Sequence, residues 1–159
     1  MGKLHIAFSA ILFIVPFCFC ATGTTHVRGQ LLCHGKPAIG EKIELWEKNF
    51  GFPDNLIVSD VTDNQGFFML RGSISDWVRK PIIYVYFVNY CEAAITKSFM
   101  ICGNSVKVFI PPEFVADGNL PRHIFNLDNL ELSKAITEQA GLERITHAVF
   151  SHKECRYIN

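Results

Sequence analysis

The stretch LIVSDVTDNQGFFMLR, residues 56–71, decides the fold class of this chain. Leu56–Val61 is rich in β-branched residues, and Phe67–Arg71 is a second apolar run of similar length. Between them, Thr62–Gly66 contains the Asp-Asn-x-Gly residues that favour a tight turn. A strand, a short polar turn and an aromatic strand together predict a β-hairpin and indicate an all-β protein.

Further strand signals continue on both sides of this segment. Apolar and polar residues alternate in His26–Cys33 and in Lys42–Lys48, and the residues Gly-Lys-Pro at 35–37 predict a turn between them. Three more strands are predicted by the composition of Pro81–Asn89, Val106–Ile110 and Ile124–Leu132. About seven short strands separated by turn residues predict a β-sandwich of two small sheets.

The C-terminal part of the chain has a different pattern. In Ser133–His152, the apolar residues Leu142, Ile145 and Val149 recur at helical spacing. Gly141 interrupts this stretch, so we expect a short C-terminal helical segment, either one short helix or two pieces.

The N-terminal residues have the layout of a secretory signal peptide. Lys3 precedes the apolar run Leu4–Phe19, and Cys18 and Cys20 place small side chains before a cut at Ala21. We therefore expect residues 1–20 to be a signal peptide and residues 21–159 to form one secreted, extracellular domain. The alternative is an uncleaved signal anchor, although the strongly apolar part is shorter than the ~20 residues that a membrane span needs.

The charges and cysteines limit the classes of function. The chain has 15 Lys and Arg against 15 Asp and Glu, so no excess positive charge indicates nucleic-acid binding. Four cysteines follow the signal peptide, and in an oxidising compartment they predict two disulfides with three possible pairings. Among these we expect Cys91–Cys102, which closes a local loop, together with Cys33–Cys155. No Cys-x-x-Cys or other metal-ligand spacing remains, so we expect neither a metal nor a cofactor.

Several motifs together resemble the nematode transthyretin-like family. They are Val27–Cys33, the following Gly35–Ala38, Ile43–Glu47, Thr62–Phe68, Tyr84–Cys91, Cys102, Val106–Pro111 and the late Cys155. The resemblance implies a secreted, disulfide-bonded, transthyretin-like (prealbumin-like) β-sandwich whose ligand is mostly unknown among members. Because transthyretin pairs its subunits to make a ligand channel, the resemblance also raises a homo-oligomer as an alternative to a monomer. Where the family often has His-Asp-Cys, this chain has Asn89-Tyr90-Cys91, and Ser133–His152 is longer than usual.

One protein with a related fold is an enzyme, the 5-hydroxyisourate hydrolase. The alternative prediction is that this chain is an enzyme of that kind. The chain resembles it in Thr25-His26-Val27, in the turn at Gly35–Ala38 and in the strand Ile43–Trp46. His26 would then be the general base that activates water. The hydrolases also use an Arg, a second His and a C-terminal Tyr-Arg-Gly-Ser, but this chain ends in Cys155–Asn159 without that motif. We therefore expect no enzymatic activity.

Aromatic residues provide the best candidates for binding. Alternation along the predicted strand Pro81–Asn89 places Tyr84 and Tyr86 on one face. Tyr90 directly follows this strand, and Trp46 lies in the predicted strand Lys42–Lys48. Such a patch can stack a ligand or contact a partner subunit. Trp46, Tyr84, Tyr86 and Tyr90 are therefore the candidate contacts for an unidentified extracellular partner, which is a small hydrophobic molecule, a cell-surface lipid head group or a protein. The alternative is that these rings pack in the core or at an edge covered by the second sheet.

Overall fold

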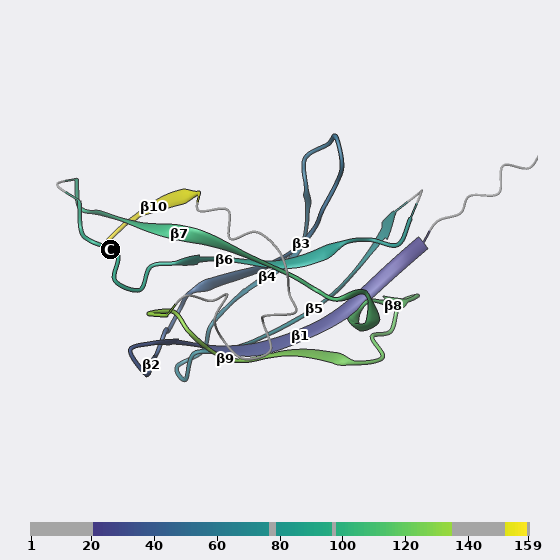
Figure 1. Ribbon diagram of the computed structural model, residues 1–159, viewed down its shortest axis with the longest axis horizontal. Coiled ribbons are helices and arrows are strands. Elements are labelled where there is room, and N and C mark those ends of the chain that lie inside the picture. Colours follow the sequence, from purple (N-terminus) through teal and green to yellow (C-terminus); the bar gives the residue numbers. More distant parts are fainter. Residues whose placement is uncertain (1–20, 77–78, 97, 135–151, 159) are drawn as a thin grey trace, which may run out of the picture.

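The protein is a β-sandwich in which two five-stranded sheets pack face to face. The computed structural model describes residues 21–76, 79–96, 98–134 and 152–158. In Figure 1 one sheet runs along the upper half of the molecule and the other along the lower half. The predicted all-β sandwich is therefore confirmed. Within the described residues, no helix has the length and apolar character needed to cross a membrane.

Sheet A is organised around the long strand β1 (Ala21–Cys33). On one side β1 pairs antiparallel with β5 (Phe67–Asp76), and on the other it pairs parallel with β9 (Ile124–Glu131). Two short strands, β2 (Lys36–Pro37) and β8 (Ala116–Asp117), add to the ends of β1. Every other strand of sheet A is thus positioned by β1.

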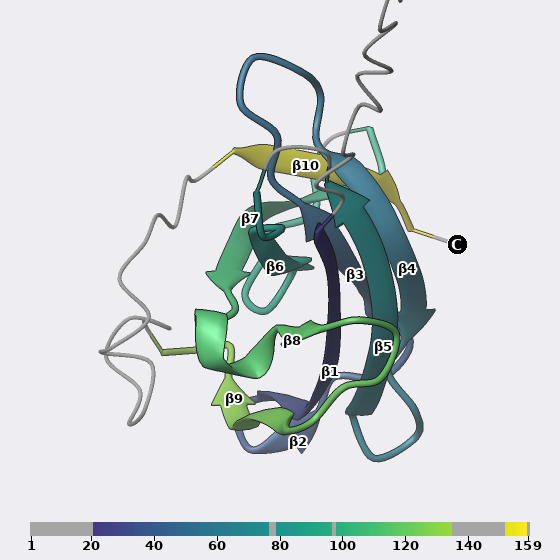
Figure 2. The ribbon, with the colours of Figure 1, turned by 90° about the vertical axis from the view of Figure 1, so that its right-hand side faces the viewer.

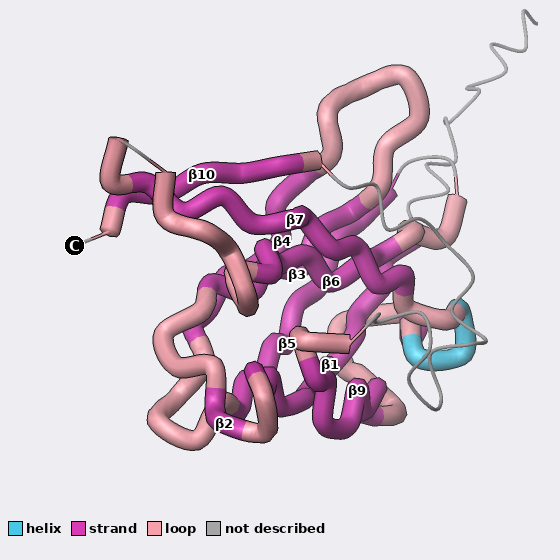
Figure 3. Tube along the Cα trace, turned by 60° about the vertical axis from the view of Figure 1, so that its left-hand side comes forward, coloured by secondary structure: helices cyan, strands magenta, loops and turns pink. Residues whose placement is uncertain are grey.

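Sheet B is entirely antiparallel, in the order β10–β7–β6–β3–β4. Its strands are β3 (Lys42–Glu47), β4 (Asn55–Val61), β6 (Ile83–Asn89), β7 (Met100–Phe109) and β10 (Lys153–Tyr157). Figure 2 shows β10 at the opposite end of the molecule from β9. A short 3₁₀ turn at Pro112–Phe114, which comes just before β8 in the chain, is the helical element drawn in Figure 3.

The core between the sheets follows from alternation along each strand. Val27 and Leu31 of β1 and Ile43 and Leu45 of β3 belong to one core cluster, and all four side chains are fully buried. Further core residues come from the same alternating positions of the other long strands: Phe68, Leu70, Ile83, Val85, Phe87, Val106, Val108, Phe125, Leu127 and Leu130. The residues between them point outward and form the two outer faces on which the functional sites are sought.

All the predicted strands exist, but the structure adds to them. The described residues form ten strands rather than about seven, because β2, β8 and the C-terminal β10 were not predicted. Strand β7 also begins at Met100, six residues before the predicted start at Val106. The predicted signal peptide, residues 1–20, and nearly all of the predicted C-terminal helical segment lie outside the described residues.

The predicted hairpin of residues 56–71 is wrong, because its two strands belong to different sheets. β4 pairs with β3 in sheet B, whereas β5 pairs with β1 in sheet A. The turn itself forms: the Gly66 amide donates to the Asp63 carbonyl at 2.9 Å, and the Asp63 amide to the Phe67 carbonyl at 2.9 Å. Beyond this turn the chain changes sheet, so local sequence signals predicted the turn but not the strand partners.

The predicted disulfide pairing is also wrong. The structure joins Cys33 to Cys91 and Cys102 to Cys155, with Cα–Cα distances of 5.7 and 4.0 Å. The second bridge connects residues directly opposite each other in the β10–β7 ladder. The pairing depends on β10, a strand that the sequence analysis did not identify, so spacing along the chain favoured the wrong partners.

Glu131, the last residue of β9, holds the turn between β1 and β2 in place. Its two carboxylate oxygens accept hydrogen bonds from the backbone amides of His34 and Gly35, each at 2.8 Å, and Oε1 also accepts from the Ser133 hydroxyl at 2.7 Å. Burial alone would raise the pKa of Glu131, but these hydrogen bonds outweigh it and lower the pKa from 4.5 to about 2.

The substitution Glu131→Gln is therefore expected to destabilise the protein in a pH-dependent way. Because the folded-state pKa is lowered, the contribution of the carboxylate is fully present above pH 4.5 and is lost as the pH falls towards 2. Since the group is partly solvated, we expect a loss of about 1–2 kcal/mol near neutral pH. Urea unfolding of both proteins at several pH values measures it. A difference between them that stays constant down to the lowest pH would contradict this role.

Candidate functional site

The outer face of sheet B carries a hollow that contains three of the four predicted binding residues. Alternate positions of neighbouring strands bring Trp46 of β3 beside Tyr84 and Tyr86 of β6. The hollow has a volume of about 400 Å³. We call it the sheet B hollow, and its lining residues are Glu44, Trp46, Tyr84, Tyr86, Ser105, Lys107, His152 and Glu154.

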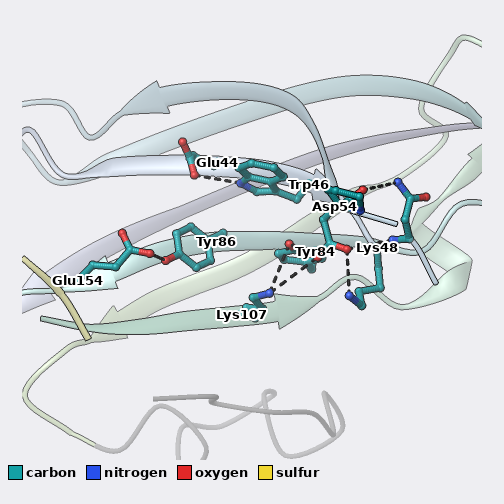
Figure 4. Close-up of polar contacts among 10 residues, drawn as sticks. Glu44, Trp46, Lys48, Asp54, Tyr84, Tyr86, Lys107 and Glu154 are labelled. Atoms are coloured by element: carbon teal, nitrogen blue, oxygen red, sulfur yellow. Dashed lines mark hydrogen bonds and ion pairs between the residues drawn. The ribbon is translucent and has the colours of Figure 1, made fainter. Parts of the chain in front are cut away.

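One end of the sheet B hollow is held together by Asp54 (Figure 4). The Tyr84 hydroxyl donates to Asp54 Oδ2 at 2.7 Å, and Lys48 Nζ donates to Asp54 Oδ1 at 2.9 Å. Lys107 Nζ lies 3.8 Å from Asp54 Oδ2 and 4.8 Å from the centre of the Tyr84 ring. Burial alone would raise the pKa of Asp54, but the hydrogen bonds from Lys48, Tyr84 and Asn49 lower it below its usual value. Asp54 is thus a carboxylate that fixes Tyr84 and Lys107.

The tyrosine hydroxyls of the hollow are hydrogen-bond donors. Burial, followed by the hydrogen bond to Asp54, raises the pKa of Tyr84 well above its usual value. Burial and the hydrogen bond to Glu154 raise the pKa of Tyr86 in the same way. Both hydroxyls therefore stay protonated at physiological pH and serve to orient carboxylates, as Figure 4 shows for Tyr86 and Glu154.

Tyr90, the fourth predicted residue, lies in a smaller adjoining hollow of about 310 Å³. The Arg156 guanidinium lies over the Tyr90 ring, 4.0 Å from its centre. Arg156 also donates to both carboxylate oxygens of Glu41, at 2.8 and 3.1 Å. The two hollows share Glu44, Tyr86 and Glu154, but the Tyr90 ring is already contacted by a protein cation.

A further hollow lies on the outer face of sheet A and was not predicted. Its volume is about 550 Å³, and we call it the sheet A hollow. Four apolar side chains line it with large exposed fractions: Val61 at 55%, Phe67 at 46%, Met69 at 60% and Ile124 at 44%. They come from the end of β4, from β5 and from the start of β9.

A sequence signal for the sheet A hollow does exist in Phe67–Leu70. Phe68 and Leu70 are buried in the core, so the alternate residues Phe67 and Met69 must face outward. A surface strand is usually polar on its solvent face, and an apolar residue at both positions marks a contact surface. Val61 and Ile124 join the hollow only because of where β4 and β9 lie in the fold. The local pattern in Phe67–Leu70 gives no information on the positions of these strands.

Some polar residues of the sheet A hollow form hydrogen bonds with other protein groups, and others do not. Asp63 accepts hydrogen bonds from the amides of Gln65 and Phe67, both at 2.8 Å, so it serves the turn. Gln30 donates to the Gln65 carbonyl at 2.7 Å. The side chain of Arg28, exposed on the outer face of β1, makes no hydrogen bond or ion pair with any residue that the structure describes. Its guanidinium is available to a polar group on a ligand.

His26, the candidate base of the hydrolase alternative, lies on the outer face of β1. The strand register places it opposite Arg71 of β5 and Ile124 of β9. Within the described part of the chain, it has neither a hydrogen bond nor an ion pair with a carboxylate. Such a partner is what a catalytic histidine uses to hold its ring and tautomer.

One group of residues has the proximity of a metal site. Cys33, His34 and Cys91 place their potential ligand atoms within 4.8 Å of one another. Both sulfur atoms are joined in the Cys33–Cys91 disulfide, however, and a disulfide offers no thiolate to a metal. This cluster is therefore a structural bridge beside an exposed histidine.

Comparisons with known proteins agree with the fold. A family model described as the Transthyretin-like family matches residues 28–111. Transthyretin-like protein 1 of Caenorhabditis elegans is 32% identical over 114 residues, which are 67% of this chain and 70% of that protein. Transthyretin-like protein 46 of the same organism is 28% identical over 87% of this chain and 75% of its own length.

Among solved structures, the likeness is weak. A 9R-lipoxygenase from Cyanothece aligns with 68% of this chain and 16% of its own, at 17% identity and a TM-score of 0.39, too low to carry an argument. The segment that the family model matches runs from the second half of β1 to the end of β7, and so includes core residues of both sheets. On the family model and the 32% identical relative, the chain belongs to the transthyretin-like family.

Proposed function

We propose that this protein is a secreted, extracellular binding protein that acts without catalysis and holds a small apolar molecule in the sheet A hollow. The observation that carries the proposal is the group of four exposed apolar side chains around a hollow of about 550 Å³. This volume lies within the ~300–1,000 Å³ that is usual for small-molecule pockets. A polar group on the ligand would face Arg28, which has no partner among the described residues.

Secretion is supported by the signal-like residues 1–20 and by the two disulfides. Disulfides persist in oxidising compartments and are rare in the cytosol, and the described cysteines are all oxidised. N-terminal sequencing of the protein exported from a eukaryotic cell tests this part. A mature chain that starts at Ala21 is expected, and retention in the cytosol with reduced thiols would contradict it.

The absence of catalysis is supported by the incomplete set of groups around His26. The outer-face neighbours given by the strand register are Arg71 and Ile124, and neither is a carboxylate that could hold the imidazole. Incubating the purified protein with 5-hydroxyisourate and following the absorbance tests this part. Turnover above the spontaneous rate that is lost on His26→Ala would overturn the proposal.

The binding step is tested with a neutral apolar dye such as Nile red. We expect saturable binding of one dye per chain, and we expect Met69→Ser to weaken it about tenfold, because a partly buried thioether side chain contributes about 1.4 kcal/mol to an apolar contact. The matched control is Leu120→Ser. Leu120 lies outside the hollow, and its side chain is 71% exposed. Equal binding by both variants would contradict the assignment.

Sizing chromatography with light scattering separates this proposal from self-association through the same surface. If two copies covered the hollow, the wild type would be an oligomer that excludes the dye, and Met69→Ser would shift it towards monomer. We expect instead that Met69→Ser weakens dye binding and has the same oligomeric state as the wild type.

A further inference from the structure

Three tyrosine rings line the outer face of sheet B, and two of them already carry a cation of the protein. Lys107 Nζ lies 4.8 Å from the centre of the Tyr84 ring, and the Arg156 guanidinium lies 4.0 Å from that of Tyr90. Both cations are balanced by carboxylates, Lys107 by Asp54 at 3.8 Å and Arg156 by Glu41 at 2.8 Å. The rings of Tyr84 and Tyr90 are therefore each already in contact with a cation of the protein, and a carboxylate balances its charge.

Tyr86 differs from both neighbouring tyrosines. It lines the sheet B hollow and also the adjoining hollow, and no cation from the described residues lies over its ring. Two carboxylates flank it instead: Glu44, directly opposite in the β3–β6 ladder, and Glu154, which accepts the hydrogen bond from the Tyr86 hydroxyl. The middle position thus combines an aromatic ring with negative charge.

The charge at this position is only partly balanced. Glu44 forms an ion pair with Lys42 and accepts from Trp46 Nε1 at 3.0 Å. Glu154, by contrast, has no ion pair with a cation among the residues that the structure describes. Trp46 and Tyr84 line the same hollow as Tyr86, so three aromatic side chains, two carboxylates and the Lys107 ammonium surround one space of about 400 Å³. The Lys107 ammonium lies at the Tyr84 end of this space, 3.8 Å from Asp54 Oδ2, which balances its charge.

We propose that the sheet B hollow binds a quaternary ammonium group of the choline type. Rings of Trp and Tyr attract such a cation through the negative face of their π systems, and nearby carboxylates add charge attraction. In this hollow, Trp46 and Tyr86 supply the aromatic surface, and Glu44 and Glu154 supply the charge.

A quaternary ammonium fits better than a primary ammonium such as a lysine side chain. A primary ammonium has three N–H donors that each need an acceptor when water is removed. Both oxygens of Glu44 are already engaged, by Lys42 and by Trp46, and Oε1 of Glu154 is engaged by Tyr86. A trimethylammonium group needs no hydrogen bonds, so it can use the charge of these carboxylates without competing for their lone pairs.

This chemistry has two sources, a soluble choline-type molecule and a phosphatidylcholine head group at a lipid surface. It is independent of the sheet A hollow, because the two hollows lie on the outer faces of different sheets and share no residue. Met69→Ser, which tests the proposed function, is therefore expected to leave this site unchanged.

The test is isothermal titration calorimetry with choline chloride and with its neutral isostere 3,3-dimethylbutan-1-ol. We expect saturable binding of one choline per chain, at least about tenfold tighter than the alcohol, because only the charged ligand gains from the rings and carboxylates. No saturable binding of choline, or equal binding of both compounds, would overturn the proposal.

Two variants assign the binding to this hollow. Tyr86→Leu removes the ring and Glu154→Gln removes the charge, and each is expected to weaken choline binding about fivefold to tenfold. The matched control is Tyr157→Leu, which removes an exposed ring of the same strand β10 that lines neither hollow and is expected to leave choline binding unchanged. Because Glu154 lies on the exposed strand β10, Glu154→Gln keeps the test valid even if Tyr86→Leu fails to fold. Choline affinity unchanged in Glu154→Gln would overturn the assignment.

Vesicles distinguish the source of the group. Co-sedimentation with phosphatidylcholine vesicles but not with phosphatidylglycerol vesicles, inhibited by free choline, identifies a lipid head group as the ligand. Binding of free choline without vesicle binding identifies a soluble ligand of the same class. Binding to phosphatidylglycerol alone would contradict a site for a quaternary ammonium.

Discussion

Removal of the Cys33–Cys91 disulfide by the double substitution Cys33→Ala and Cys91→Ala is expected to lower the free energy of unfolding by about 4 kcal/mol. The bridge closes a loop with a sequence separation of 58, and the chain-entropy model gives about 4 kcal/mol for a loop of that length. Since domains of this kind are stable by only ~5–15 kcal/mol, this loss is a large fraction of the total. Urea unfolding followed by far-UV circular dichroism measures it.

The position of the bridge explains why the full effect is expected. Cys33 is the last residue of β1 in sheet A, and Cys91 lies two residues after the end of β6 in sheet B. Cys91 also packs against the core cluster between the sheets. Both ends are therefore part of the same cooperative unit, and neither can be released without opening the sandwich.

The second disulfide provides the matched control. Cys102–Cys155 has a similar sequence separation of 53, so the chain-entropy model alone predicts the same loss. Its second end, however, is on β10, whose five residues are all exposed. If β10 can detach while the core stays folded, removing this bridge costs only the stability that β10 itself contributes. We therefore expect the Cys102→Ala, Cys155→Ala variant to lose at most about 2 kcal/mol in the free energy of unfolding.

Hydrogen exchange separates the two effects. In the Cys102→Ala, Cys155→Ala variant, the amides of β10 should lose protection while those of β1 and β6 keep it. In the Cys33→Ala, Cys91→Ala variant, protection should fall across the core of both sheets. Equal losses of stability in the two double variants would show that β10 belongs to the cooperative core and would contradict this account.

The disulfides also show how far sequence reasoning reaches. Alternation and turn residues predicted the strands, because each of these signals is contained in a few neighbouring residues. The pairing of Cys102 with Cys155 instead depends on β10 joining the edge of β7, a contact between segments about fifty residues apart. No local pattern in Lys153–Tyr157 states which strand it will join.

The candidate sites follow the same division. Alternation alone placed Tyr84 and Tyr86 on one face, and the structure shows both lining one hollow. The position of Trp46 beside Tyr84 depends on the register of β3 against β6, and that of Glu154 beside Tyr86 depends on β10. The sheet A hollow was missed for a similar reason, because its apolar residues come from three strands that the sequence does not place relative to one another.

The segment that changes sheet at Thr62–Gly66 gives the second large expected effect, that of Gly66→Ala. Gly66 has a φ of +79°, which costs a side-chain-bearing residue about 1–2 kcal/mol. A Cβ atom there would also collide with the Leu31 carbonyl oxygen and lie 3.3 Å from the Ala38 nitrogen. It would thus enter between the Ala38 amide and the Leu31 carbonyl, which form a hydrogen bond of 2.9 Å. We expect a total loss of at least about 3 kcal/mol in the free energy of unfolding.

Gly40→Ala separates the collision from the backbone strain. Gly40 has a similar φ of +70°, and its amide also donates a backbone hydrogen bond, to the Thr62 carbonyl at 3.0 Å. A Cβ atom at Gly40 would meet nothing within 4 Å, so only the strain of about 1–2 kcal/mol should remain. Urea unfolding of the two variants under one condition measures the difference. An equal loss in the free energy of unfolding for Gly66→Ala and Gly40→Ala would contradict this account. It would show that the close contact between β1 and the turn does not determine where the chain passes from sheet B to sheet A.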